Sequence, residues 1–292
     1  MNILLADSGA TKTDWCLLQL PNEGTSQPNT PMSRYKTQGI NPFHQSVDTI
    51  KDILREELLT QLRSAEPIQQ IHFYGAGCTK EMKGKVKQAL KASFPHATIQ
   101  VESDLLGAAR AVCGSTQGLV GILGTGANSC LYDGRQILEN IPPLGYILGD
   151  EGSGAALGKR LLNALFKNPD YNRLQQLFLA YDHCTYADVI ERVYRQPLAN
   201  RYLASLVAFV KEYQHEELLQ KLVVENFESF ITANLLQYNT SLRDLYVVGG
   251  MAAAFPEALE TACEQHGFRL CNIMRSPIEG LIAYHKENHS AR

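Results

Sequence analysis

The sequence predicts an α/β protein whose two related halves flank a cleft, and three observations support this fold. The chain has 292 residues, and a single domain takes about 150 residues. Each half opens with apolar, strand-like runs around a glycine-containing turn, at residues 2–20 and 119–139. Each half then alternates between helix-like and strand-like segments, which is typical of an α/β fold. We therefore expect one domain at 1–115 and a second at 116–276, with a cleft between them as the favoured place for a ligand.

The first half reads as three strands followed by alternating helices and strands. Its opening apolar run stops at Asp7, and a glycine turn leads directly into the next run, which predicts a hairpin. Apolar side chains at helical spacing predict the helices. The predicted elements are strands at 2–6, 15–20, 33–37, 71–74 and 98–101, and helices at 45–63, 80–94 and 104–112. Residues 21–31 are rich in Pro, Asn, Ser, Thr and Gly and are expected to form a long turn.

The second half repeats this opening and adds a long helical region at 154–238. The dipeptide Asp133-Gly134 is a hairpin signal between its second and third strands. The other predicted elements are strands at 119–123, 129–132, 136–139, 244–248 and 268–272, and helices at 256–266 and 277–288.

Composition excludes several classes of protein. The 27 Lys and Arg against 30 Asp and Glu give a net charge of −3, whereas a nucleic-acid surface is expected to be basic. No window approaches the roughly 20 apolar residues that span a bilayer, and no targeting segment is apparent at the N-terminus. The seven cysteines include no C-x-x-C pair, so we expect reduced thiols in a cytoplasmic protein. The histidines show no H-x-x-x-H spacing for zinc.

Two glycine-containing loops follow buried strands, one in each half. In residues 7–14, Asp-Ser-Gly-Ala-Thr-Lys-Thr-Asp, successive N–H groups and the hydroxyls of Thr11 and Thr13 could hold a phosphate. Asp7 could hold Mg²⁺ through water, because this cation prefers oxygen ligands; an ordinary β-turn capped by an Asp is the alternative. Residues 124–129, Gly-Thr-Gly-Ala-Asn-Ser, fail as a dinucleotide motif, because a serine replaces the third glycine and a strand follows.

Three further motifs lie at the ends of predicted strands or at the starts of helices. Asp104 follows a strand and opens a helix, where a carboxylate serves either as an N-cap or as a base. Asp150 and Glu151 lie in Gly-Asp-Glu-Gly-Ser-Gly, where acids are favoured by the helix dipole or contact a ligand. Gly249 and Gly250 follow a strand and let a flat ring approach the backbone, unless they form a simple turn.

In this order, the motifs resemble the acetate/sugar kinase–Hsp70–actin superfamily. Within it the chain resembles the BadF/BadG/BcrA/BcrD ATPase family, and most closely the N-acetylglucosamine kinases. The segments that carry the resemblance are Gly-Ile-Asn at 39–41, Glu-Ser-Asp at 102–104, Gly-Thr-Gly-Ala-Asn at 124–128 and Leu-Gly-Asp-Glu-Gly-Ser-Gly at 148–154. The resemblance implies two ribonuclease H-like (actin-like ATPase) domains, the second with a large helical insertion. It also implies that residues 277–292 pack back on the first domain, and that the chain can form a homodimer.

The resemblance also implies a function, ATP-dependent phosphorylation of the 6-hydroxyl of an amino sugar, with N-acetylglucosamine as the expected substrate. Asp104 matches the catalytic aspartate, and Asp7 matches the acidic position near Mg²⁺. The positions that match sugar contacts are Asn41, Asn128, Gly145 and Asp150. The positions that match ATP contacts are Asp7, Gly9, Thr11, Lys12, Thr13, Gly124, Thr125, Gly126, Gly249 and Gly250.

Two other functions fit the same family. An ATPase activator would carry an iron–sulfur cluster between two subunits, with Cys113 and Cys130 as the nearest candidate ligands. A non-catalytic sugar sensor would bind the sugar without turnover, although sensors of this kind usually carry a DNA-binding segment and none is apparent here.

Overall fold

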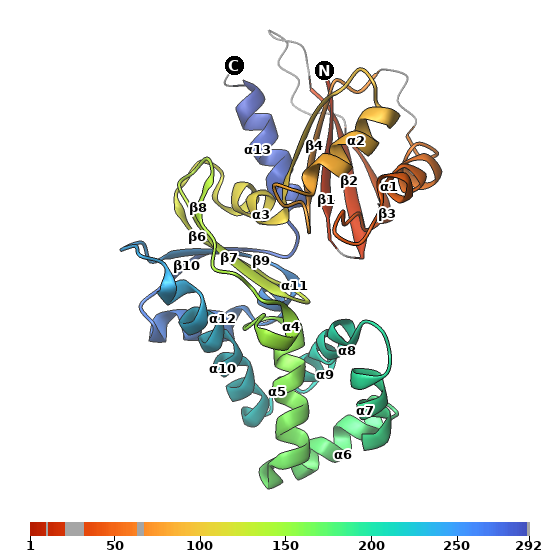
Figure 1. Cartoon of the computed structure of the whole chain (residues 1–292). Helices are drawn as coiled ribbons and strands as arrows, with labels where there is room; N and C mark the ends of the chain where they lie inside the picture. Colours follow the sequence, from red (N-terminus) through yellow and green to blue (C-terminus); the bar gives the residue numbers. More distant parts are fainter. Residues whose placement is uncertain (10, 21–31, 63–66, 291–292) are drawn as a thin grey trace. The chain divides into compact units, whose positions relative to one another are not determined.

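The computed structural model describes residues 1–9, 11–20, 32–62 and 67–290. The long turn expected at 21–31 lies outside them. By its internal contacts the chain divides into two compact units. Unit 1 comprises residues 1–115 and 277–292, and unit 2 comprises residues 116–276. Each unit is described by itself below (Figure 1).

Unit 1 is built on one mixed five-stranded sheet. Its strands are β1 (Asn2–Ser8), β2 (Lys12–Gln19), β3 (Met32–Gln38), β4 (Gln70–Gly75) and β5 (Thr98–Ser103). The order across the sheet is β3-β2-β1-β4-β5. β1, β2 and β3 pair antiparallel, as short hairpin connections require, while β4 and β5 run parallel to β1. The carboxyl ends of β1, β4 and β5 therefore lie at one edge of the sheet.

Helices cover this sheet with apolar faces. They are α1 (Val47–Ile53), which continues into the π-helix η1 (Leu54–Leu58), α2 (Lys83–Ser93), α3 (Asp104–Cys113) and α13 (Ile278–Ser290). The helix predicted at 45–63 thus changes its winding after Ile53, and Ile50, Leu54 and Leu58 are buried along it. The end of that predicted helix falls among residues that the structure does not describe.

The C-terminal helix α13 packs against α3, β1 and β2 (Figure 1). The two helices α13 and α3 approach at Gly280, where an added Cβ would lie 2.3 Å from the carbonyl oxygen of Ala111. A hydrogen bond of 3.0 Å also joins His285 Nε2 of α13 to the hydroxyl of Tyr74 on β4. Residues far apart in the sequence therefore pack together on the sheet of unit 1.

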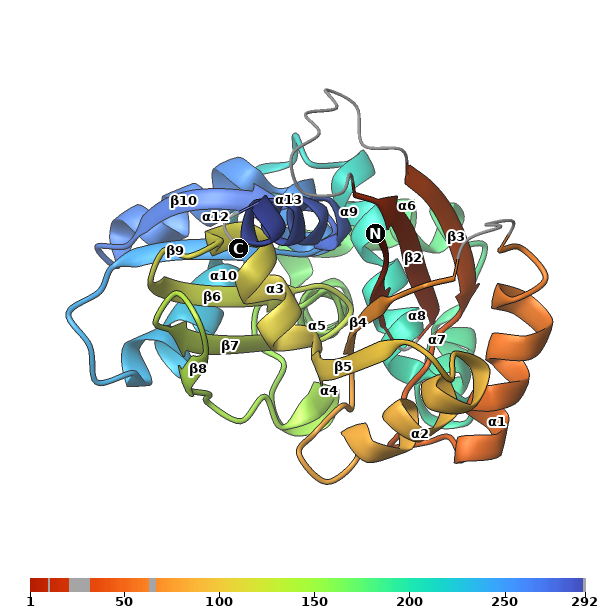
Figure 2. The ribbon, with the colours of Figure 1, turned by 90° about the horizontal axis from the view of Figure 1, so that it is seen from above.

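Unit 2 repeats the topology of unit 1. Its strands are β6 (Gly118–Leu123), β7 (Ala127–Tyr132), β8 (Ile137–Glu139), β9 (Asp244–Val248) and β10 (Arg269–Met274). The order is β10-β9-β6-β7-β8, with β6, β7 and β8 antiparallel and β9 and β10 parallel to β6 (Figure 2). Counted within each unit, both sheets have the order 3-2-1-4-5. This confirms the predicted α/β class with two ribonuclease H-like sheets.

The helical insertion of unit 2 lies between β8 and β9. It consists of α4 (Gly145–Leu148), α5 (Gly154–Lys167), η2 (Pro169–Tyr171), α6 (Asn172–Tyr181), α7 (Tyr186–Tyr194), α8 (Ala199–Ser205), α9 (Val207–Glu212), α10 (Glu217–Ala233) and η3 (Leu235–Gln237). Two further helices, α11 (Gly250–Ala254) and α12 (Pro256–Gln265), lie between β9 and β10. A single apolar core, which includes Phe178, Phe209, Phe227 and Phe230, joins the insertion to the sheet.

The structure corrects three local predictions. β1 does not stop before Asp7 but runs through Ser8, because both residues pair with β2 and β4. A helix, α11, begins at Gly250, where the sequence indicates no helix but only a glycine pair open to a flat ring or a simple turn. The short helix α4 was not predicted at all, since four residues are too few to show a hydrophobic period.

Among the described residues, no helix is long and apolar enough to cross a membrane.

Candidate active site

The first candidate loop is the turn between β1 and β2. Its backbone closes through the N–H of Gly9, which donates to the carbonyl of Lys12 at 3.0 Å. Thr13 is fully buried, and its hydroxyl lies 2.7 Å from that of Ser8 and 3.1 Å from the carbonyl of Gln38. This hydroxyl holds the loop against the end of β3, whereas the side chain of Thr11 is exposed.

Two carboxylates of unit 1, Asp7 on β1 and Asp104 after β5, lie close enough to interact. Burial, together with the charges of Asp104 and Asp14, raises the pKa of Asp7 to about 7, and Lys12 opposes this rise. Burial likewise raises the pKa of Asp104, while the backbone N–H groups of Leu105 and Asp104 lower it. The parallel strands bring these residues together, because β1 and β5 end at the same edge of the sheet.

Asp104 is held firmly at the start of α3. Ser103 is the N-cap, and its Oγ accepts the N–H of Leu106 at 3.2 Å, so capping does not need Asp104. One carboxylate oxygen, Oδ1, accepts the N–H of Leu105 at 2.9 Å. The other oxygen, Oδ2, has no hydrogen-bond partner among the described residues and can accept a proton or a hydroxyl donor.

The residues at this edge fit a magnesium ion. The carboxylate of Asp7 has no hydrogen-bond donor in the part of the chain that the structure describes, and two further carboxylates raise its pKa. A divalent cation would neutralise that charge. The described residues contain no group of three or more His, Cys, Asp or Glu side chains that could enclose a metal. Mg²⁺ does not need one, because it commonly binds one or two carboxylates, waters and substrate phosphates.

Asn41 lies beside the end of β4. Its Oδ1 accepts the N–H of Phe43 at 3.0 Å, and its own N–H donates to Gln45 Oε1 at 2.8 Å. Gly77 has a positive φ of 74°, and an added Cβ there would lie 2.1 Å from Asn41 Oδ1. These contacts fix the amide, and its Nδ2 is left without a partner among the described residues. Asn41 can therefore donate to a polyhydroxylated ligand.

The second candidate loop joins β6 to β7 and is fastened to the start of α5. The N–H groups of Gly154 and Ala155 donate to the carbonyls of Gly124 and Thr125 at 2.8 and 3.1 Å. Within the described chain, the N–H groups of Thr125 and Gly126 have no acceptor. A loop whose carbonyls are occupied and whose N–H groups are free is suited to bind an anion.

Asp150 lies against this second loop. Its Oδ1 accepts the N–H of Ala127 at 3.1 Å. Its backbone has a φ of +58°, which few residues other than glycine adopt. Burial and the charge of Glu151 raise the pKa of Asp150, while the Ala127 N–H and Lys159 lower it.

The two other predicted sugar positions of unit 2 differ in exposure. Asn128 is half-buried, and its Oδ1 accepts the Nδ2 of Asn140 at 2.8 Å and the N–H of Ser129 at 2.9 Å. Gly145 is exposed, has a φ of +74° and begins α4. The hydrogen-bonded Asn128 is thus fixed in place, whereas Gly145 presents open backbone.

The Gly249-Gly250 pair joins β9 to α11 at a close approach of two strands. Gly249 has a φ of +139°, and an added Cβ would lie 2.0 Å from the carbonyl oxygen of Leu123 at the end of β6. Only glycine fits there. At Gly250 an added Cβ would meet nothing within 4 Å, so its face is open to a ligand.

Comparison with known proteins adds to this geometry. No family model matches the chain, and no curated protein matches it either. A crystal structure of the "putative N-acetylglucosamine kinase" of Porphyromonas gingivalis is 43% identical, covers 98% of this chain and 99% of its own, and superposes with a TM-score of 0.89. This chain belongs to the N-acetylglucosamine kinase-like family.

More distant structures share the fold of this family. The "putative N-acetylglucosamine kinase" of Chromobacterium violaceum is 19% identical over 97% of this chain and 98% of its own, with a TM-score of 0.70. A ROK-family glucokinase of Streptomyces griseus, solved with glucose and AMPPNP, is 13% identical over 97% of this chain and 98% of its own, with a TM-score of 0.53.

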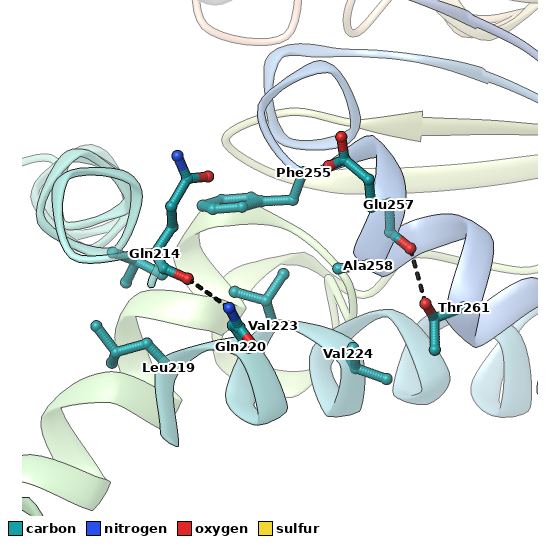
Figure 3. Close-up of a pocket in the computed structure, with 10 residues that line it drawn as sticks. Gln214, Leu219, Gln220, Val223, Val224, Phe255, Glu257, Ala258 and Thr261 are labelled. Atoms are coloured by element: carbon teal, nitrogen blue, oxygen red, sulfur yellow. Dashed lines mark hydrogen bonds between the residues drawn. The ribbon is translucent and has the colours of Figure 1, made fainter. Parts of the chain in front are cut away.

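Unit 2 also contains a cavity of about 300 Å³ between α9, α10 and α12 (Figure 3). Phe255, which lies between α11 and α12, forms part of its wall, together with Val223 and Gln214. The side chain of Lys211 approaches the ring of Phe255 and donates to the carbonyl of Ala254 at 2.7 Å. None of these residues belongs to a recognisable sequence motif, so the sequence does not predict this cavity.

Sequence reasoning also missed residues that support the predicted site in unit 1. Gly77 lies in close contact with the Asn41 side chain. Gly107 of α3 packs against Tyr74, where an added Cβ would lie 2.8 Å from the Tyr74 side chain. The signal available for Gly77 was the Gly-Ala-Gly run after a strand. Gly107 had no signal, because a single glycine within a helix does not indicate what packs against it.

Proposed function

We propose that this chain is an ATP-dependent kinase that phosphorylates an amino sugar at its 6-hydroxyl, with N-acetylglucosamine as the substrate. Membership in the N-acetylglucosamine kinase-like family supports a sugar kinase. The observation that carries the chemistry is the Asp104 carboxylate, which is fixed at the start of α3 and has one oxygen without a partner among the described residues. Its raised pKa makes it a better base than an exposed aspartate.

In this proposal Asp104 orients the acceptor hydroxyl and takes its proton during phosphoryl transfer. Phosphoryl transfer depends mainly on positioning and charge neutralisation. The amide of Asn41 donates to the sugar, and Asn128, Gly145 and Asp150 are proposed sugar contacts in unit 2. Mg²⁺, when bound through Asp7, would neutralise charge on the phosphates.

The proposed ATP contacts come from both loops. At the first loop the proposed contacts are Gly9, Thr11, Lys12 and Thr13. The Thr13 hydroxyl is already hydrogen-bonded to Ser8 and Gln38, so the exposed hydroxyl of Thr11 is the more accessible of the two. Gly124, Thr125 and Gly126 form the second loop, and its free N–H groups suit phosphate oxygens. Gly249 and Gly250 are proposed to contact the nucleotide ring, because the face of Gly250 is open.

The cysteines do not favour the alternative of an iron–sulfur ATPase. Cys113 and Cys130 are both buried. A cluster shared between two subunits needs thiolates at the surface of each subunit, and these buried thiols do not provide them.

The test is an ADP-release assay with Mg-ATP and a panel of sugars. The panel contains N-acetylglucosamine, glucosamine, N-acetylmuramic acid, N-acetylmannosamine and glucose, with a no-sugar control. We expect strong turnover with N-acetylglucosamine, and the position of the phosphate is read by NMR of the product. Equal ADP release with and without every sugar would refute the kinase and favour an ATPase. No turnover together with sugar-induced thermal stabilisation would favour a sensor.

A further inference from the structure

The second loop offers three consecutive backbone N–H groups, and an acidic side chain occupies one of them. Those of Thr125 and Gly126 have no acceptor within the described chain, while the N–H of Ala127 donates to Asp150 Oδ1 at 3.1 Å. The carbonyls of this loop point to α5, which binds two of them. The face of the loop that is suited to an anion is therefore partly occupied by a carboxylate of the protein itself.

The carboxylate of Asp150 also lies directly over Gly126. An added Cβ at Gly126 would lie 2.9 Å from Asp150 Oδ2 and 3.3 Å from Oδ1. Any side chain at Gly126 would therefore displace the carboxylate. Oδ1 of Asp150 accepts the Ala127 N–H, and both oxygens lie in the space that a side chain at Gly126 would fill.

The backbone of this segment is held in an unusual conformation. Asp150 has a φ of +58°, and Gly152 follows with a φ of +80°. At Gly149 an added Cβ would lie 2.2 Å from the carbonyl oxygen of Pro143, whose oxygen also accepts the Asp150 N–H at 3.0 Å. Residues other than glycine in the left-handed region cluster at active sites and at segments that hold a ligand.

We propose that Asp150 gates the phosphate loop, so that ATP binds tightly only after the sugar is bound. This inference rests on the proposed kinase function and adds a regulation of its site. Without a sugar, the carboxylate holds the Ala127 N–H and repels phosphate oxygens. Hydroxyl groups of the sugar donate to the carboxylate, weaken its hold on the Ala127 N–H and release the loop for the nucleotide. Such a gate limits ATP hydrolysis in the absence of sugar.

The experiment measures the affinity of AMPPNP with Mg²⁺ by calorimetry, in the absence and presence of N-acetylglucosamine. For the wild type we expect the sugar to tighten AMPPNP binding by about tenfold, within the range usual for coupled sites. For Asp150→Asn we expect AMPPNP to bind about tenfold more tightly without sugar, because the charge is lost. The sugar should then change the affinity by less than it does in the wild type, because the charge that it masks is already gone.

Asparagine suits this test because it keeps an acceptor for the Ala127 N–H and tolerates a positive φ better than most residues. Glu151→Gln is the matched control. It removes the adjacent charge, and Glu151 has no hydrogen bond to the loop among the described residues. Its AMPPNP affinity, with and without sugar, should stay within twofold of the wild type.

Two results would overturn the gate. One is an Asp150→Asn variant that binds AMPPNP no more tightly than the wild type in the absence of sugar. The other is an equal gain in affinity for Glu151→Gln, because the effect would then be one of general charge. Neither measurement depends on turnover, so a failed gate is distinguishable from a failed kinase assignment, which the sugar panel tests.

Discussion

Replacing Asp7 by asparagine should stabilise the protein at neutral pH while it removes activity. Asp7 has its pKa raised from 3.8 to about 7 by burial and by the charges of Asp104 and Asp14. Asparagine has nearly the same shape and no charge. The wild-type fold is destabilised whenever Asp7 is ionised, and the variant is not.

The magnitude follows from the pKa. A tenfold change in acidity is worth about 1.4 kcal/mol, so the rise from 3.8 to about 7 corresponds to about 4 kcal/mol at pH 8. The sign follows from proton binding: between these two pKa values the folded state binds more protons than the unfolded state, so stability falls as pH rises. The advantage of Asp7→Asn should therefore shrink to about 2 kcal/mol at pH 5, where folded Asp7 is mostly protonated.

The assay is urea unfolding of the wild type and Asp7→Asn at pH 8 and pH 5, with EDTA present. Thermal unfolding at pH 8 should show a rise in Tm of roughly 10 °C. Asp48→Asn is the control, because Asp48 is exposed and its one ion pair among the described residues is with Lys51 on the surface. Its effect should stay below about 0.5 kcal/mol. Adding Mg²⁺ should stabilise the wild type and leave Asp7→Asn unchanged.

An Asp7→Asn variant that is less stable than the wild type at pH 8 would refute this reasoning. An advantage that does not change between pH 8 and pH 5 would refute it as well, since it would then not come from ionisation. A stabilised variant with full kinase activity would instead show that Asp7 is not needed in catalysis.

Three other predictions concern the base and the packing of glycines. Asp104→Asn should lower kcat by about 10²–10⁴-fold with little change in the KM for ATP, as steady-state kinetics will show; a loss below tenfold would exclude the base role. In the wild type, kcat should fall on acidification through a pKa above the ordinary 3.8 of an aspartate, because burial raises the pKa of Asp104; a kcat that stays constant down to pH 4 would contradict this. Gly158→Ala should lower the free energy of unfolding in urea by about 1–3 kcal/mol, because its Cβ would lie 2.1 Å from the carbonyl oxygen of Leu203. The control is Gly84→Ala in α2, whose Cβ would meet nothing within 4 Å; it should raise the free energy of unfolding by about 0.5 kcal/mol.

The fold class and the order of the longer elements follow from patterns along the chain alone. Apolar runs separated by glycine turns predict hairpins, and apolar side chains at helical spacing predict helices, because both patterns depend on neighbours along the chain. The confirmed strands and helices lie within a few residues of their predicted positions. The misses, α4 and α11, are helices of four and five residues, which are too short to show a period.

The candidate site was predictable only as a set of separate motifs. The resemblance assigned Asp7, Asp104 and Asp150 their expected roles, but it did not show what each side chain touches. The raised pKa of Asp7 comes from its burial and then from the charge of Asp104, which lies 97 positions away in the sequence. The parallel pairing of β1 with β4, and of β4 with β5, brings them together.

The tertiary structure alone decided which polar groups are occupied and which are free. It placed the Thr13 hydroxyl in a buried hydrogen bond with Ser8, and it placed the Asp150 carboxylate on the Ala127 N–H. Neither contact leaves a pattern in the sequence, because hydrogen bonds and burial depend on residues that only folding brings into contact. The physical reason is general: periodicity is a local property of the chain, whereas electrostatics and hydrogen bonding at a site are properties of its surroundings in space.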